Sequence, residues 1–173
     1  VGVDVVHGHR LADQLGLAVP ALGEQRPDRA VDHARGQRRL LARTGLAPDR
    51  WPARSFASIA AVGFALTAYP IGVARGWITR EQARERALST LRFFHDAPQG
   101  PEATGVAGYK GFFYHFLDMA SGTRFGDCEL STIDTALLLA GALHCQSFFD
   151  GADAEETQIR FLADELYARV DWP

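Results

Sequence analysis

The sequence has 173 residues, enough for one domain with a hydrophobic core, and carries a formal net charge of −3 with an isoelectric point near 6.1. This weakly acidic balance gives no electrostatic case for binding nucleic acid or an anionic membrane surface. No span reaches the roughly 18 uninterrupted apolar residues of a membrane helix, and the first residues lack the layout of a secretion signal. We therefore expect a soluble chain, with neither nucleic acid nor a membrane as its partner.

The two cysteines, Cys128 and Cys145, do not have the spacing of a metal site. Cys145 lies inside an apolar run, where a free thiol behaves as a small hydrophobic side chain. A disulfide between the two cysteines stays open at this point, and so does the redox compartment.

Aromatic residues are distributed very unevenly along the chain. All 18 of them lie at or beyond Trp51, whereas the first 50 residues include an arginine-rich stretch at 26–43. A segment with so little apolar surface to bury cannot offset its chain entropy. We predict that residues 1–45 are weakly structured or atypical and that the folded domain spans 46–173. A sequence artefact, such as a shifted reading frame, is an alternative explanation of the break.

From residue 55 onward the pattern predicts four helices of two kinds. Residues 55–75 and 131–149 are apolar on nearly every side, whereas 80–95 and 153–170 each carry one apolar stripe. A helix that is apolar all round must be buried on all sides, while a striped helix faces water. We therefore expect two inner helices, 55–75 and 131–149, packed against each other with the striped pair outside.

Local signals mark the helix ends. Thr79 and Gln82 have the spacing of a capping box, and Asp153 and Glu156 repeat that spacing before the last helix. Pro70 should kink the first helix or end its regular part.

The alternation of inner and outer helices predicts an all-α fold, a partial (α/α)6 toroid in which a closed ring would need more helices than these four. The alternative is an ordinary four-helix bundle. In such a bundle an all-apolar helix would expose a patch larger than the usual few hundred Å².

The segment 111–118 combines four aromatic side chains with a histidine and a carboxylate, in the order GFFYHFLD. Aromatic rings stack on sugar faces, and paired carboxyl groups perform the acid–base chemistry of glycoside hydrolysis. We expect a short hairpin-like aromatic insertion here, lining a carbohydrate-cleaving pocket.

Several blocks of sequence resemble one family, the bacterial glucoamylase-like glycoside hydrolases that include endo-β-1,2-glucanases. The resemblance covers residues 46–173 and is carried by the blocks 49–52, 55–64, 75–78, 108–118 (GYKGFFYHFLD) and 129–143 (ELSTIDTALLLAGAL). It implies an (α/α)6 toroid, no metal or other cofactor, an oligo- or polysaccharide substrate, and a periplasmic or secreted bacterial location. The implied reaction is hydrolysis of β-linked glucan by an inverting route.

The sequence departs from the family at both ends. The usual aromatic first helix is replaced by 1–45, and the family continues past residue 173 through the second half of the ring. We therefore expect either the first part of a hydrolase, whose inner helices need that second half or a partner chain to cover them, or a non-catalytic half domain that binds carbohydrate. A plain helical scaffold would not explain the clustered aromatics and acids.

The resemblance places the sugar cleft at the N-terminal ends of the inner helices, where free N–H groups and the helix dipole also favour carboxylates. Glu129, two residues before the second inner helix, is a candidate acid or base, and a dipole-stabilised surface acid is the alternative. Asp134 is a second catalytic candidate, although its spacing from Ser131 also fits a helix cap.

Five further residues are candidates for contact with sugar. Strand alternation would place Tyr114 on one face and His115 on the other, so one of them can meet substrate while the other packs in the core. Asp118 precedes a predicted turn and is either a turn residue or a sugar contact. Trp51 and Arg54, just ahead of the first inner helix, can stack on a ring and bind hydroxyls, or simply fix the loop.

Overall fold

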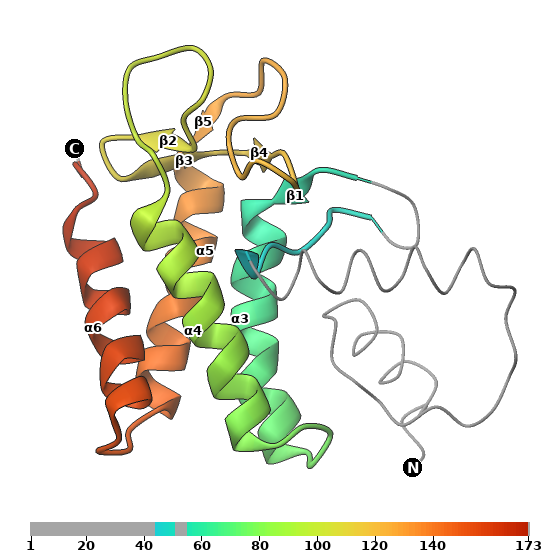
Figure 1. Ribbon diagram of the computed structural model, residues 1–173, viewed down its shortest axis with the longest axis vertical. Helices are drawn as coiled ribbons and strands as arrows, with labels where there is room; N and C mark the ends of the chain where they lie inside the picture. The colour runs from blue at the N-terminus through green and yellow to red at the C-terminus, as the bar shows by residue number, and fades with distance from the viewer. Residues whose placement is uncertain (1–43, 51–54, 173) are drawn as a thin grey trace, which may run out of the picture.

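The computed structural model describes residues 44–50 and 55–172, and in them four helices lie alongside one another (Figure 1). They are α3 (Ile59–Ala74), α4 (Arg80–Asp96), α5 (Thr132–Phe148) and α6 (Ala154–Ala168). The four predicted helices are thus confirmed, with ends shifted by a few residues. The predicted segment 1–45 falls almost entirely outside the described residues.

Five short strands gather at the end of the helices where α3 and α5 begin (Figure 1). They are β1 (Ala57–Ser58), β2 (Gly108–Tyr109), β3 (Phe112–Tyr114), β4 (Phe116–Leu117) and β5 (Leu130–Ser131). β1 pairs with β4, and β3 pairs with both β2 and β5, all antiparallel. Because β1 leads into α3 and β5 leads into α5, the aromatic segment ties the starts of these two helices together.

Local side-chain bonds fix the helix ends. Thr79 and Gln82 form the predicted capping box, with each side chain accepting a hydrogen bond from the other residue's backbone N–H, at 3.1 and 3.0 Å. Pro70 lies inside α3, which continues to Ala74, so of the two expectations for this proline, a kink or an early end, the early end is wrong. Asp153 caps α6, but Glu156 does not reach back to it.

Glu156 instead joins α6 to α4 through an ion pair in which the carboxylate is buried and the side chain of Arg80 is 40% exposed. The Glu156 side chain is only 2% exposed, and its two carboxylate oxygens accept from Nε and Nη2 of Arg80 at 2.7 and 2.8 Å. The same carboxylate accepts from the backbone N–H of Gly151 at 2.7 Å. These bonds satisfy a carboxylate that would otherwise be costly to bury.

The helices α3 and α5 make more extensive contact than any other pair of described elements, which confirms that they pack against each other. They approach closely where Gly63 meets Gly141, because neither residue has a side chain at the crossing. Large residues between the helices and under the strands form the core, among them Leu66, Leu91, Phe94, Phe113, Leu138, Phe149, Ile159 and Leu166.

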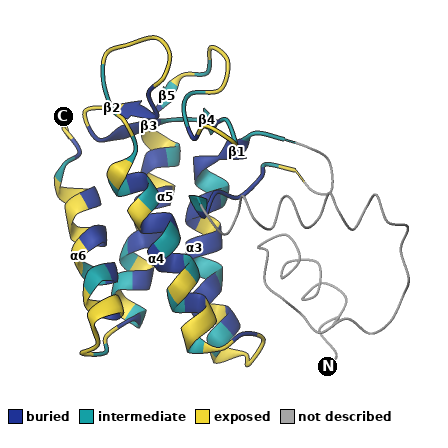
Figure 2. Ribbon diagram, in the orientation of Figure 1, coloured by how far each residue is buried: buried dark blue, intermediate teal, exposed yellow. Residues whose placement is uncertain are grey.

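In the part of the chain that the structure describes, α3 and α5 are not buried on all sides, although their apolar pattern is that of helices buried all round. Phe64 on α3 is 62% exposed and Ile133 on α5 is 74% exposed, with Ile71 and Leu137 also facing solvent. Figure 2 shows such exposed positions along helices whose other sides are buried. The all-round apolar pattern therefore marks surfaces suited to burial, but among the described elements α4 and α6 leave one side of each inner helix uncovered.

Candidate functional site

The first turn of α5 is built around Ser131. The Ser131 hydroxyl oxygen accepts from the backbone N–H of Asp134 at 3.1 Å, and its hydroxyl group donates back to the Asp134 carboxylate. Ser131 is therefore the N-cap of α5, and Asp134, three residues later as its spacing predicts, bonds to this cap through its backbone N–H and its carboxylate. Its side chain is only 16% exposed.

His115 brings Glu129 and Asp134 together. Nδ1 of His115 lies 2.8 Å from Oε1 of Glu129, and Nε2 of the same ring lies 3.7 Å from Oδ1 of Asp134. Both carboxylates therefore lie at one imidazole ring. Two predicted catalytic residues and one predicted substrate contact thus form one cluster.

The backbone holds His115 at the junction between α3 and α5. Its N–H donates to the carbonyl of Glu129 at 3.0 Å, and its own carbonyl accepts from the N–H of Ile59, the first residue of α3, at 3.2 Å. The imidazole also stacks on Phe116, with centroids 3.8 Å apart. Fold contacts on three sides therefore fix the position of the ring.

The expected alternation along 112–117 is interrupted at His115. Phe113 and Leu117 are fully buried, as two residues on one face should be, but the His115 side chain between them is 30% exposed. The reason is that β3 ends at Tyr114 and β4 begins at Phe116, in a different sheet. Tyr114 lies under Arg124, whose guanidinium carbon is 4.5 Å from the ring centre.

Electrostatics at the cluster favour an ionised Glu129. Hydrogen bonding to its own backbone N–H and to His115 lowers the pKa of the Glu129 carboxyl below its ordinary value. The side chain remains 66% exposed, so in this chain it is accessible to solvent. An accessible carboxylate at a helix start can accept a proton from water or contact a hydroxyl-rich ligand.

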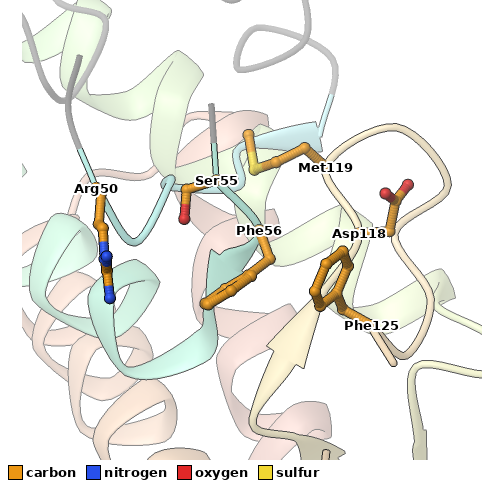
Figure 3. A pocket seen from close by; sticks show the side chains of 6 residues that line it. All are labelled: Arg50, Ser55, Phe56, Asp118, Met119 and Phe125. Carbon is orange, nitrogen blue, oxygen red and sulfur yellow. The ribbon is translucent and has the colours of Figure 1, made fainter. Parts of the chain in front are cut away.

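An aromatic-lined hollow lies near the start of α3. It has a volume of about 480 Å³ and is lined by Arg50, Ser55, Phe56, Asp118, Met119 and Phe125 (Figure 3). The ring of Phe56 lies 5.0 Å from that of Phe125 and 4.1 Å from that of Phe116, between centroids. Because Phe116 also stacks on His115, a continuous row of rings connects the hollow to the carboxylate cluster.

Asp118 lines this hollow while it stabilises the following turn. Its Oδ1 accepts from the backbone N–H groups of Ala120 and Ser121, at 3.0 and 2.8 Å, and Gly122 adopts a positive φ of 72°. The bonds from Ser121 and Ala120 lower the pKa of Asp118. Asp118 therefore has the turn role that was one of its two interpretations, and it also borders the hollow.

Sequence reasoning did not single out Phe56, Phe125 or Met119 as site residues. Phe56 stands in a quoted block, but its partners become neighbours only through the pairing of β1 with β4 and the turn that follows. Trp51 and Arg54 lie outside the described residues.

Among the described residues, Cys128 and Cys145 are free thiols, so the disulfide left open by the sequence is absent. Burial raises the pKa of the Cys145 thiol to about 12. In residues 44–50 and 55–172, no group of three His, Cys, Asp or Glu side chains is placed to hold a metal ion. No helix in this part of the chain is long and apolar enough to cross a membrane.

Comparison with known proteins gives a consistent set of relatives. The chain is 30% identical over 135 residues to an exo-β-1,2-glucooligosaccharide sophorohydrolase (non-reducing end) from Parabacteroides distasonis, covering 75% of this chain and 18% of that protein. Over this stretch the chain is a homologue of a β-1,2-glucanase. The resemblance found in the sequence is thereby confirmed, although the chain spans less than a fifth of that relative's length. No family model matches.

Solved structures agree on the fold. A β-1,2-glucanase from Parabacteroides distasonis superposes with a TM-score of 0.66 at 29% identity, covering 75% of this chain and 18% of that one. A glucoamylase-like protein from Bacteroides uniformis gives a TM-score of 0.67 at 24% identity, covering 87% of this chain and 38% of that one. The four helices therefore have the arrangement found in glucoamylase-like structures.

Proposed function

We propose that this chain contributes part of the active-site wall of a glycoside hydrolase that acts on β-linked glucan, with β-1,2-glucan as the preferred substrate. The observation that carries the proposal is the cluster of Glu129, His115 and Asp134 at the start of α5. Homology to a β-1,2-glucan-acting enzyme supports the choice of substrate.

The proposed mechanism is inverting hydrolysis, in which one carboxylic acid protonates the leaving oxygen while a carboxylate activates water. We assign the base to Glu129, because His115 lies at hydrogen-bond distance from its carboxylate and its side chain reaches solvent. As base it takes a proton from the attacking water. Asp134 is assigned as the acid, since it is the other carboxylate at His115 among the described residues. The alternative role of Asp134 is structural, as a partner of the Ser131 helix cap, and mutation must distinguish this role from catalysis.

The aromatic hollow is proposed as the adjoining sugar site. Phe56 and Phe125 offer apolar ring surface, and Arg50 and Asp118 border it with charged groups that hydrogen-bond to hydroxyls. Tyr114 is less suited to stack on sugar, because Arg124 covers one side of its ring. Trp51 and Arg54, which flank the same loop in sequence, remain predicted sugar contacts.

We propose that residues 46–173 are the first part of an (α/α)6 toroid whose cleft is completed by further helices. Apolar side chains on α3 and α5 that face solvent, such as Phe64 and Ile133, support a larger toroid, because further inner helices would cover them. The same face also favours a second function, that of a non-catalytic, carbohydrate-binding half domain that depends on a partner chain.

Measuring hydrolysis of β-1,2-glucan distinguishes the hydrolase from the non-catalytic, carbohydrate-binding half domain. Residues 46–173 would replace the matched segment of the Parabacteroides distasonis relative, and release of reducing ends from β-1,2-glucan would be measured for this chimera and for the 173-residue chain alone. The hydrolase proposal predicts activity in the chimera and none in the isolated chain, whose cleft lacks its second wall. A folded chimera that binds glucan without releasing sugar would favour the non-catalytic function.

A further inference from the structure

We propose that His115 is a positioning residue that orients the Glu129 carboxylate at the start of α5, and that it is not a sugar contact. The inference rests on the role proposed above for Glu129, but it concerns a relationship present in this chain without substrate. It replaces the expectation, drawn from the aromatic segment, that His115 faces the sugar.

Hydrogen-bond chemistry assigns the proton on the ring. An ionised carboxylate only accepts hydrogen bonds, so Nδ1 of His115 must carry the hydrogen in its 2.8 Å contact with Glu129. Nε2 of the same ring lies 3.7 Å from Oδ1 of Asp134, beyond hydrogen-bond distance. Both ring nitrogens therefore face carboxylates of the chain, and Nδ1, which donates to Glu129, is not available to a hydroxyl group of a ligand.

The surroundings of the ring leave it little freedom to move. Phe116 stacks on its face, and its backbone is bonded to Glu129 on one side and to the first residue of α3, Ile59, on the other. The His115 backbone donates to the Glu129 carbonyl, and its ring donates to the Glu129 side chain. Two bonds from one residue, 14 positions away in sequence, therefore fix Glu129. This geometry fixes both the backbone and the side chain of Glu129, as a preorganised base requires.

The charged groups within ion-pair distance of the ring, among the described residues, are the two carboxylates of Glu129 and Asp134. Removal of the imidazole should therefore change the pKa of Glu129, which the loss of packing alone would not do. Glu129 would lose a donor that stabilises its ionised form, and its proton affinity would rise.

The test is a carboxyl carbon NMR titration of Glu129 in the 173-residue chain, which needs neither substrate nor activity. Four proteins are compared: wild type, His115→Phe, His115→Asn and His144→Phe. The asparagine side chain can still present an N–H donor near the position of Nδ1, whereas the phenylalanine side chain keeps an aromatic ring and has no donor. His144 is an exposed histidine on the same helix as Asp134 and serves as the matched control.

The proposal predicts that the Glu129 titration midpoint rises in His115→Phe, returns toward wild type in His115→Asn, and is unchanged in His144→Phe. An unchanged midpoint in a folded His115→Phe protein would overturn it. If His115→Phe does not fold, His115→Ala, which also lacks a donor, takes its place: an unchanged Glu129 midpoint in that variant would overturn the proposal.

The active chimera provides a second, independent readout. A positioning role predicts that His115→Asn retains more kcat than His115→Phe, with KM for β-1,2-glucan nearly the same in both. A rise in KM with unchanged kcat would identify a sugar contact and contradict the proposal. If the chimera is inactive but the Glu129 midpoint shifts as predicted, the proposed function fails and the positioning inference stands.

Discussion

Gly141 lies against the backbone of Gly63 where α5 crosses α3: a Cβ built on Gly141 would come 2.3 Å from the Gly63 carbonyl oxygen. The converse is equally tight, since a Cβ on Gly63 would lie 2.3 Å from the carbonyl oxygen of Leu137. Backbone atoms cannot move aside as the end of a flexible side chain can. The spacing between the two apolar helices, and with it the distance between their N-terminal ends, therefore depends on these glycines.

We expect Gly141→Ala to destabilise the chain by about 1–3 kcal/mol, because forcing a methyl group into a packed crossing costs more than the gain in helix propensity of up to about 1 kcal/mol. Gly72→Ala in α3 is the matched control, since its Cβ would meet only the side chain of Ile78, at 3.2 Å. Urea unfolding of both variants measures the difference. Equal stabilities would show that the helices can separate at little cost.

The ion pair between Arg80 and Glu156 predicts a pH-dependent stability. The hydrogen bond from Arg80 is the main cause of the lowered Glu156 pKa. The folded pKa lies below the unfolded one, so this stabilisation is complete above about pH 4.3 and is lost as pH falls through the folded pKa. We expect Glu156→Gln to cost about 1.5–3 kcal/mol near neutral pH.

Melting curves between neutral and acidic pH check this expectation. The gap in Tm between wild type and Glu156→Gln should narrow as the solution becomes acidic. Glu155→Gln is the control, because Glu155 is 55% exposed and pairs with Arg84 near the surface, where such pairs are worth about 0–1 kcal/mol. A Tm gap that is independent of pH would show that the Glu156 charge does not contribute.

The N-terminal boundary of the domain can be tested at Leu46. This side chain is fully buried, and the preceding Gly45 accepts a hydrogen bond from Thr90 of α4 at 3.3 Å. We expect Leu46→Ala to cost about 2–5 kcal/mol, as for other buried leucines. Removal of residues 1–43, by contrast, should cost less than about 1 kcal/mol, a few degrees in Tm. A larger loss on that deletion would place part of 1–43 in the core.

Sequence reasoning succeeded where the responsible contacts are local. The capping box of Thr79 and Gln82 and the cap formed by Ser131 and Asp134 each involve residues three apart, so composition and spacing suffice to find them. Glu156 shows the limit of this reasoning. Its spacing from Asp153 favoured a capping box, but Arg80, 76 residues away in sequence, offers a charged partner and takes the carboxylate instead.

The meeting of His115 with Glu129 could not be predicted from the pattern. It depends on the register between β3 and β5, and strands of two or three residues carry almost no periodicity. Which faces of α3 and α5 are exposed could not be predicted from the pattern either. The pattern marks Phe64 and Ile133 as apolar residues suited to burial, but no described element covers them.

Catalysis by Glu129 is tested by the rate of reducing-end release from β-1,2-glucan by the chimera carrying Glu129→Gln. Asp127→Asn is the matched control, because Asp127 is an exposed carboxylate two residues away. Loss of a required base lowers the rate by about 10²–10⁴-fold, so we predict a fall of that size for Glu129→Gln and a rate close to the parent chimera for Asp127→Asn. A near-parental rate for Glu129→Gln would show that Glu129 is not the catalytic base.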